Sequence, residues 1–260
     1  MDERVVLSVE DKVATIRLNR PEAYSALDRD TVGALQTILL QVSTDPKIHG
    51  VVITGAGKAF SAGGDIRGVM AHPQGPAAAF NVLAAHVHLC VVEIRRMRKP
   101  VVAAINGVAA GGGFSLALAS DFRVMARSAR LKQGFTSNAL SIDGGATFTL
   151  PRLVGLARAL EIAAFDEPIP AEQALAWGLV TRVVDDGEAL AEAERLVHAV
   201  AERSLHTFGW SKQLLTDSSD TSLEAQLECE RQGLIACVSH PDGVEGMTAF
   251  LEKRPPVFNR

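Results

Sequence analysis

The sequence predicts an α/β fold, and three features of the chain support that prediction. Short β-branched runs alternate with longer stretches of helical hydrophobic periodicity, which gives recurrent strand–strand–helix units. Two of these runs lead into glycine-rich segments, at residues 59–65 and 107–115. Beyond Gly145 the pattern becomes almost wholly helical, interrupted by one expected strand at 179–184. With 260 residues, the chain is long enough for one large domain or for a domain with an appendage.

The individual elements follow from hydrophobic pattern and from their flanking residues. Strands are expected at 5–10 and 13–19, joined by a hairpin turn at 11–12. Asp28 is placed to cap a helix that runs to about Val42. The next elements are expected, in order, to be strand 51–54, helix 77–97 ending before Pro100, strand 101–105, helix 114–119 and strand 121–126.

Composition limits the binding partners and the cellular compartment that we expect for the protein. The net charge is −4 and no run of Lys or Arg is long enough for a nucleic-acid face, so no nucleic-acid partner is expected. The three cysteines are widely spaced and form no Cys-x-x-Cys pair, which favours a reducing compartment over disulfides or zinc. The N-terminus is charged, which argues against a secretory signal. We therefore expect a cytoplasmic protein.

One uncharged stretch, residues 100–120, is nearly long enough to cross a bilayer. Its asparagine and its glycines argue against a span and favour a buried strand, a loop and a buried helix. No membrane association is predicted.

The two glycine-rich segments are candidates for an oxyanion hole. Glycine lets the chain turn sharply and lets a ligand approach backbone N–H groups. Two such loops that face each other can hold one oxygen between two N–H donors, which stabilises an enolate at low reorganisation cost. Glycines after strands also form simple turns, so spacing alone leaves both interpretations open.

The residues themselves carry a resemblance to a known family. The segments at 18–28, 55–65, 99–107, 111–113 and 250–258 resemble the crotonase superfamily of enoyl-CoA hydratases and isomerases. The match runs in order from about residue 5 to the C-terminus. The resemblance implies the superfamily's ββα spiral, with residues 1–198 as the acyl-CoA-binding core and 199–260 as a C-terminal helical trimerisation region.

The resemblance also implies binding residues. It places the two oxyanion-hole donors at Ala62 and Gly112, the second at the N-terminus of a helix that adds partial positive charge. The positions expected to line the coenzyme A moiety are Ala23, Tyr24, Ala26, Ala62, Gly64, Asp65, Ile66 and Gly112. For Tyr24, a partly buried core aromatic is an equally good interpretation.

The acid–base positions depart from the hydratase pattern. Hydratases of this family carry two glutamates, and the matching positions here hold Ser115 and Phe135. A serine hydroxyl cannot activate water as a carboxylate does, and phenylalanine cannot do so at all. Ordinary two-glutamate hydration is therefore not expected.

Asp143 is the carboxylate that remains in this region. Apolar residues precede it and glycines follow, so we expect its side chain in a confined pocket. Isomerases of the phenylacetyl-CoA pathway are similar in placing an aspartate here. The alternative is that Asp143 is only the N-cap of a helix beginning near Gly145. His86 and His88, two apart on a predicted helix, point to different faces and are interpreted as structural.

A single base suits isomerisation of a 3-enoyl-CoA to a 2-enoyl-CoA, with coenzyme A as part of the substrate and no metal or redox cofactor. Two alternatives stay open: a hydratase or another crotonase activity with non-standard acid–base residues, and an inactive CoA-thioester-binding protein. The resemblance implies a homo-trimer or hexamer and a place in fatty-acid metabolism. Apolar residues that a lone chain would expose on its last helices are Leu234, Ile235, Met247, Phe250 and Leu251.

Overall fold

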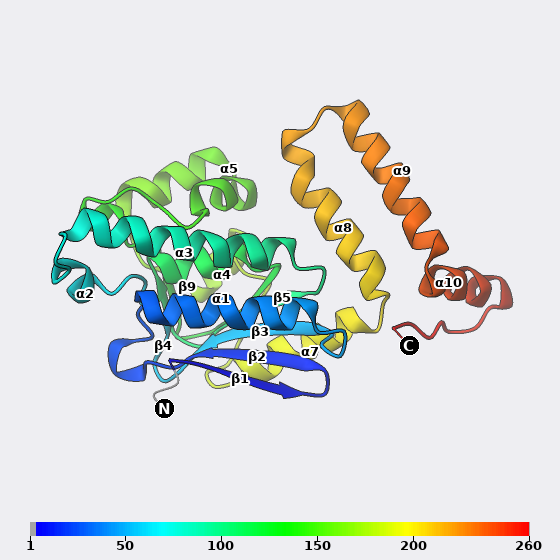
Figure 1. Ribbon diagram of the computed structural model, residues 1–260, viewed down its shortest axis with the longest axis horizontal. Helices are drawn as coiled ribbons and strands as arrows, with labels where there is room; N and C mark the ends of the chain where they lie inside the picture. The colour runs from blue at the N-terminus through cyan, green and yellow to red at the C-terminus, as the bar shows by residue number, and fades with distance from the viewer. Residues whose placement is uncertain (1–3, 260) are drawn as a thin grey trace.

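The N-terminal hairpin begins the larger of two β-sheets in the computed structural model, which describes residues 4–259 (Figure 1). Strands β1 (Val5–Glu10) and β2 (Val13–Leu18) pair antiparallel, and the turn residues Asp11 and Lys12 have positive φ angles of 46° and 67°. The remaining strands of this sheet join in parallel in the order β1-β2-β3-β5-β7-β10. They are β3 (Gly50–Gly55), β5 (Val101–Ile105), β7 (Phe122–Ala126) and β10 (Arg182–Val184). The predicted α/β class is therefore confirmed.

Helices cover both faces of this sheet. Helix α1 (Arg29–Thr44) begins as predicted at Asp28, whose carboxylate accepts a hydrogen bond of 2.8 Å from the Thr31 N–H. It packs against α3 (Pro76–Arg96), while α7 (Ala189–Ala201) covers the opposite face at β3, β5 and β7 (Figure 1). By length and composition α3 also matches a membrane-spanning helix, but one of its faces packs into the core through Leu83, Val87, Cys90, Val91 and Ile94.

A second sheet was not predicted. It contains β4 (Ala59–Ser61), β6 (Val108–Ala110), β8 (Arg130–Lys132) and β9 (Ile169–Pro170), in that order. The first three pair in parallel, and β9 joins β8 antiparallel. Strands of two or three residues are too short to show a period-two pattern, so the sequence suggested loops here. This small sheet positions both glycine-rich turns.

Short helices connect the two sheets. The stretch 100–120 folds as β5, β6 and α4 (Gly112–Ala119), so the expected strand and buried helix are present, while the short strand β6 lies where a loop was expected. The strand expected at 179–184 is shorter, because the N–H groups of Leu179 and Val180 donate to Ala174 O of α6 (Ala171–Ala176) and only Arg182–Val184 pairs with β7. The other connecting helices are η1 (Pro21–Ala23), α2 (Ile66–Met70), η2 (Thr136–Asn138) and α5 (Ala146–Phe165).

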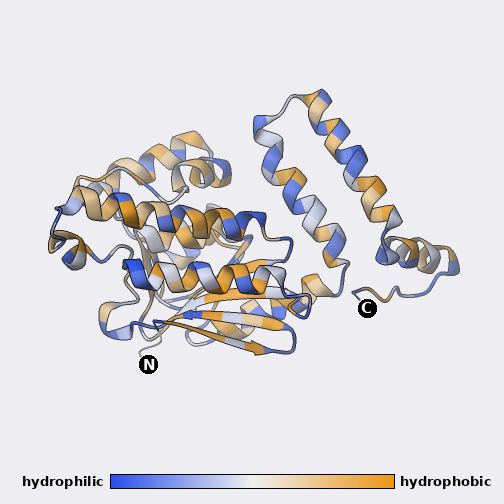
Figure 2. Cartoon of the chain, viewed as in Figure 1, coloured by the Kyte–Doolittle hydropathy of each residue, from blue (hydrophilic) through white to orange (hydrophobic). Residues whose placement is uncertain are grey.

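The last helices form an arm that extends from the core (Figure 1). The arm consists of α8 (Leu205–Asp217), η3 (Ser218–Asp220), α9 (Leu223–Ser239) and α10 (Pro241–Glu252). Hydrophobic residues recur along α9 and α10 among polar ones (Figure 2), and several of them are exposed. The predicted division at 198/199 falls within the final turn of α7 and stays a prediction.

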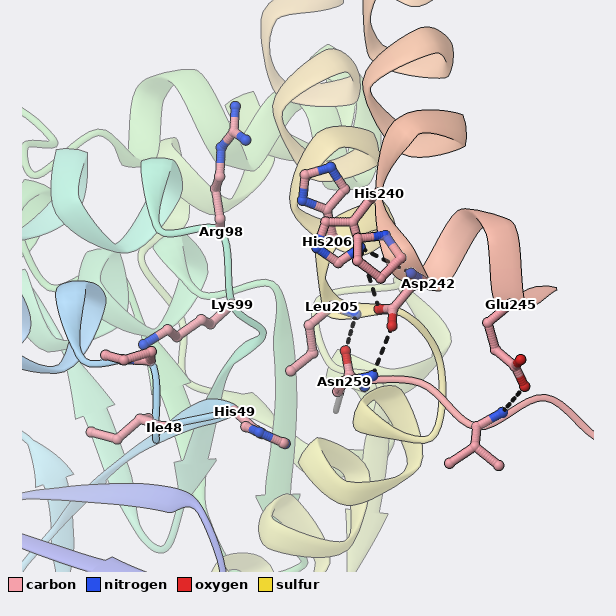
Figure 3. Close-up of a pocket in the computed structure, with 13 residues that line it drawn as sticks. Ile48, His49, Arg98, Lys99, Leu205, His206, His240, Asp242, Glu245 and Asn259 are labelled. Atoms are coloured by element: carbon pink, nitrogen blue, oxygen red, sulfur yellow. Dashed lines mark hydrogen bonds and ion pairs between the residues drawn. The ribbon is translucent and has the colours of Figure 1, made fainter. Parts of the chain in front are cut away.

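Hydrogen bonds of Lys212 and Asn259 are among the contacts that attach the arm to the core. The buried Lys212 ammonium donates to Ile94 O at 2.9 Å and to the Asp121 carboxylate at 2.8 Å. The chain beyond α10 folds back onto the arm, where Asn259 N–H donates to Asp242 and Asn259 Oδ1 accepts from Leu205 N–H, both at 2.9 Å (Figure 3). Asn259 Nδ2 reaches the core by donating to Ala201 O at the end of α7, at 2.8 Å. The hollow between arm and core has a volume of about 660 Å³ and is bordered by His49, His206 and His240 among others.

Candidate active site

Parallel pairing of β4 with β6 brings the two glycine-rich turns together. Ala59 pairs with Val108 and Ser61 with Ala109, so both strands end at the same edge of the sheet. The turns are so close that a Cβ atom on Gly63 would lie 2.7 Å from Ala110 O and 2.9 Å from Gly112 N. Gly63 also has a φ of 88°, so glycine is required here by both space and backbone conformation.

The hydrogen bonds at the first turn correct one predicted donor. The Ala62 N–H donates to Tyr24 O at 2.9 Å and is therefore occupied, contrary to its predicted role in an oxyanion hole. The Leu27 backbone bonds to both chain neighbours of Gly64. Its N–H donates to Gly63 O at 2.7 Å, and its carbonyl accepts from Asp65 N–H at 2.9 Å. Because a trans peptide points C=O and N–H in opposite directions, the Gly64 N–H faces away from Leu27.

The second turn presents the predicted Gly112. It is the first residue of α4, where an N–H group has no partner within the helix. Among residues 4–259, no hydrogen bond is recorded for the N–H of either Gly64 or Gly112. The Gly112 N–H also lies at the positive end of the α4 dipole.

A hollow of about 250 Å³ lies between these turns. Both Gly64 and Gly112 border it, together with Phe135, which occupies the second glutamate position of the hydratase pattern. The other residues around it are Ala62, Ile66, Phe80, Ala110, Gly111, Lys132, Gly134, Ser137, Asn138 and Leu140. Asp143 does not border this hollow.

The segment expected to contact coenzyme A approaches the first turn. Tyr24 has a left-handed φ of 52° and is 57% exposed, so it is not the core aromatic that was the alternative interpretation. Ala26 is buried and its carbonyl accepts from Arg20 at 2.9 Å. Arg20 also pairs with Asp28 and Asp65, at 3.0 and 3.2 Å.

This ion-pair network fixes the segment before α1 against the turn that precedes α2. The Asp65 carboxylate caps α2 by accepting from Gly68 N–H at 3.0 Å, so both of its oxygens have intramolecular partners. Burial alone would raise the pKa of Asp28, but hydrogen bonds from Thr31 and the charges of Arg20 and Arg4 lower it. Asp28 therefore stays ionised as the anchor of the network.

Ser115 links the second turn to Asp143. It lies three residues after Gly112 on α4 and is buried. Its hydroxyl donates to the backbone carbonyl of Asp143 at 2.6 Å. Gly144 packs directly on it, because a Cβ on Gly144 would lie 2.8 Å from Ser115 Cβ. The serine thus sets the position of the Asp143 backbone relative to the helix that carries Gly112.

The Asp143 side chain is not a helix cap. The N-cap residue of α5 is Gly145, and no side chain accepts a hydrogen bond there. The expected confinement is also wrong, since the Asp143 side chain is 42% exposed in the single chain. Instead of capping, Asp143 Oδ1 lies 2.7 Å from Nε2 of His88 on α3.

The His88–Asp143 contact is a feature that sequence reasoning missed. The two residues are 55 positions apart, and the histidine was interpreted as structural. As expected from their spacing, His86 and His88 diverge, because His86 Nδ1 lies 2.9 Å from Val82 O on its own helix. The described residues contain no group of three His, Cys, Asp or Glu side chains that could hold a metal ion.

The comparisons with known proteins agree with this geometry. A family model described as enoyl-CoA hydratase/isomerase matches residues 8–260. The chain is 36% identical over 259 residues to a 1,2-epoxyphenylacetyl-CoA isomerase of Escherichia coli (strain K12), with 99% of both chains covered. It is 32% identical over 256 residues to 4-chlorobenzoyl coenzyme A dehalogenase-2 of an Arthrobacter sp, covering 97% of this chain and 92% of the relative.

Solved structures give the same result. A crystal structure of an enoyl-CoA hydratase from Polaromonas sp. JS666 superposes with a TM-score of 0.93 and 35% identity, covering 98% of this chain and 99% of that one. The relatives thus include an isomerase, a dehalogenase and a hydratase, while their fold is shared over almost the full length. The chain therefore belongs to the enoyl-CoA hydratase/isomerase family.

Proposed function

We propose that this protein is an acyl-CoA double-bond isomerase that converts a 3-enoyl-CoA to a 2-enoyl-CoA. The observation that carries the proposal is the single carboxylate, Asp143, tied through Ser115 to the helix that begins with the Gly112 N–H. The two positions that hold glutamates in the hydratase pattern contain Ser115 and Phe135, neither of which can activate water.

In the proposed reaction, the thioester oxygen accepts hydrogen bonds from Gly64 and Gly112. Asp143 removes a proton from C2, and the two N–H donors stabilise the negative charge of the resulting dienolate. Asp143 then returns the proton to C4, and the double bond moves to C2–C3. The carboxylate starts and ends ionised, so the step needs no water, metal or redox cofactor.

Coenzyme A is proposed to lie along Ala23, Tyr24 and Ala26 and the turn that continues to Asp65 and Ile66. Tyr24 and Ile66 are exposed beside the Gly64 turn, which supports this path. Because both Asp65 oxygens have protein partners, we expect backbone and side-chain packing from this segment, with no carboxylate contact to coenzyme A. The setting we propose is a cytoplasmic homo-oligomer acting in fatty-acid metabolism.

Two substrates test the reaction class. Purified protein given a 3-enoyl-CoA should form 2-enoyl-CoA, which is followed by its conjugated-thioester absorbance. Hydration of crotonyl-CoA should be far slower than a typical enzymatic turnover of about 10 per second. Fast hydration would show that a different group activates water, and no turnover with binding of acyl-CoA would favour the inactive-binder alternative.

A second candidate function is hydrolytic displacement on an acyl-CoA. The His88–Asp143 pair favours it, because a carboxylate nucleophile beside an imidazole base suits formation and hydrolysis of a covalent intermediate. Two relatives that are named 4-chlorobenzoyl coenzyme A dehalogenases, each 32% identical, point the same way. Chloride release from 4-chlorobenzoyl-CoA without isomerisation of a 3-enoyl-CoA would establish this candidate over the first.

A further inference from the structure

We infer that Lys132 selects acyl groups that carry a carboxylate, so that the substrate is the mono-CoA thioester of an unsaturated dicarboxylic acid. This inference deepens the proposed function and rests on it, because it takes the hollow between the two glycine-rich turns as the place of the thioester. The observation behind it is the ammonium group of a lysine that borders this hollow. No hydrogen bond or ion pair of that group is recorded among residues 4–259.

The backbone fixes Lys132 beside the second glycine-rich turn. Lys132 lies on β8 and pairs with Ala110 on β6. Its carbonyl oxygen accepts from the Gly111 N–H at 3.2 Å, and Gly111 directly precedes Gly112, a proposed oxyanion-hole donor. Paired residues of neighbouring strands share a face, so the side chains of Ala110 and Lys132 both face the hollow, whereas Leu131 is buried on the other face.

Lys132 brings a positive charge to an otherwise uncharged wall. Among the described residues that border the hollow, the others are glycines, apolar side chains and the uncharged Ser137 and Asn138. The carboxylate of Asp166 does not border it, and its oxygens accept from the N–H groups of Gly134 and Ser137 at 2.8 and 3.0 Å. Burial acts to raise the pKa of Asp166, but these hydrogen bonds and the charge of Lys132 lower it. The lysine therefore influences Asp166 through space, while its own N–H donors are available to a ligand.

A simple alkyl acyl group would leave this ammonium without a partner. The hollow holds about 250 Å³, less than the range of about 300–1,000 Å³ for pockets that take a whole small ligand, so an acyl-CoA can place only its thioester end there. Binding then removes water from the half-buried Lys132, and burial of an unpaired charge is costly. A carboxylate on the acyl group offsets this cost with a charge-assisted hydrogen bond. The diphosphate of coenzyme A is separated from the sulfur by the whole pantetheine arm and lies too far away to do so.

The test compares matched saturated esters, which bind without being isomerised. Glutaryl-CoA and pentanoyl-CoA have acyl chains of equal length, and only the first ends in a carboxylate. Adipoyl-CoA and hexanoyl-CoA form a second such pair. In isothermal titration calorimetry, the wild type should bind the carboxylate member of at least one pair with a Kd at least about tenfold lower, as expected for a hydrogen bond between charged groups. Lys132→Met keeps an apolar stem without the charge, so it should lose this preference while binding the methyl-terminated ester at least as tightly as the wild type does.

Two control variants separate the charge of Lys132 from its packing. Lys132→Arg keeps the charge and should retain most of the preference. Lys47→Met removes the charge of an exposed lysine that does not border the hollow, and it should leave the preference unchanged. Equal Kd values within both pairs for the wild type would overturn the inference. Equal weakening of both members of a pair by Lys132→Met would also overturn it, because the lysine would then contact the coenzyme A portion.

Turnover separates this inference from the proposed function. A 3-enoyl-CoA that ends in a carboxylate should be isomerised with a higher kcat/KM than its methyl-terminated counterpart, and Lys132→Met should remove the difference. Absence of isomerisation with either substrate would overturn the proposed function, whereas the binding comparison would still decide whether Lys132 selects a carboxylate.

Discussion

At the scale of single residues, the proposed chemistry depends on one carboxylate and two backbone N–H groups. In the proposed reaction Asp143 carries the proton, and the backbone N–H groups of Gly64 and Gly112 donate hydrogen bonds to the thioester oxygen. The same scale explains why Ser115 does not act as a base: its hydroxyl is buried and already donates to Asp143 O at 2.6 Å.

Asp143→Asn separates a catalytic aspartate from a structural one. The amide cannot accept the C2 proton, so isomerase activity should fall at least about a hundredfold, the low end for general acid–base catalysis. The free energy of unfolding should change little, because the Asp143 side chain caps no helix and its backbone contact with Ser115 remains. Steady-state rates and urea unfolding measure the two effects. Near-wild-type isomerisation by a folded variant would contradict the catalytic role of Asp143.

Gly112→Pro removes one proposed oxyanion-hole donor at the first residue of a helix. Gly112 is the first residue of α4, where proline fits the helix and no helical hydrogen bond is lost. We expect kcat to fall about 100- to 1000-fold, the range found on deleting one such donor.

Gly112→Ala is the matched control for this variant. It keeps the N–H and adds only a Cβ, which would lie 3.3 Å from the movable end of Leu27. Alanine should therefore retain most activity. Equal losses in the two variants would mean that space, and not the N–H, matters at this position.

Elements bring these residues together through strand pairing and helix docking. The parallel pairing of β4 with β6 places the two turns side by side, and α4 leads from the second turn to Ser115. Helix α3 brings His88 to the Asp143 loop. Helix α8 joins the arm to this framework through Lys212, which contacts the end of α3 at Ile94 O and the Asp121 carboxylate ahead of β7.

Lys212→Ala should destabilise the docking of α8 against the core. Burial raises the pKa of Asp121 and lowers that of Lys212, and their mutual attraction opposes both shifts. Removing the lysine leaves a buried carboxylate unpaired, a change that costs about 3–5 kcal/mol. The free energy of unfolding in urea measures the loss. The double variant Lys212→Met with Asp121→Asn should recover part of it, and a single variant as stable as the wild type would contradict this account.

The whole molecule exposes more apolar surface on its arm than a lone chain in water favours. Phe250 is 82% exposed and Leu251 79% exposed on α10, and Leu234 and Ile235 are exposed on α9. Such a surface is typical of a protein interface. We expect a trimer or a dimer of trimers at micromolar concentration in sedimentation velocity. Phe250→Glu with Leu251→Glu should shift the protein toward smaller species, and a monomeric wild type would contradict the expectation.

The stability of the folded protein should also depend on pH through the arm. Burial, followed by the charge of the stacked His240, lowers the pKa of His206 below the ordinary value of about 6.5 (Figure 3). As the pH falls below about 6.5, the unfolded chain therefore takes up a proton on this residue before the folded chain does. The free energy of unfolding therefore decreases as the pH falls. This decrease continues until the pH is below the pKa of His206 in the folded chain.

His206→Gln tests this dependence. The free energy of unfolding in urea should fall between pH 7.5 and pH 5.5 in the wild type, and it should fall less in the variant. His49, which borders the same hollow, has its pKa lowered by burial and by Lys12, Lys99 and His198, so it adds a loss of the same sign. Equal losses in variant and wild type would exclude His206 as a source.

Local pattern was enough to predict the strands of the larger sheet, the helices α1, α3 and α4, and the helical character of the chain beyond Gly145. Strands β1 and β5 begin and end where the hydrophobic pattern places them, and Asp28 caps α1 as its residue type suggests. These features depend on neighbours within a few residues. The small second sheet was missed because a strand of three residues carries too little periodicity to distinguish it from a loop.

The sequence by itself determined the α/β class, the family, the glycine turn at Gly112 and the absence of glutamates at positions 115 and 135. Only the tertiary structure decided which N–H group of the first turn is free, since the Ala62 N–H is taken by Tyr24 O, 38 positions earlier. It also decided that Asp143 contacts His88 and does not cap α5. The physical reason is the same in both cases: hydrogen bonds between distant segments depend on how strands and helices pack, which no local pattern of residues specifies.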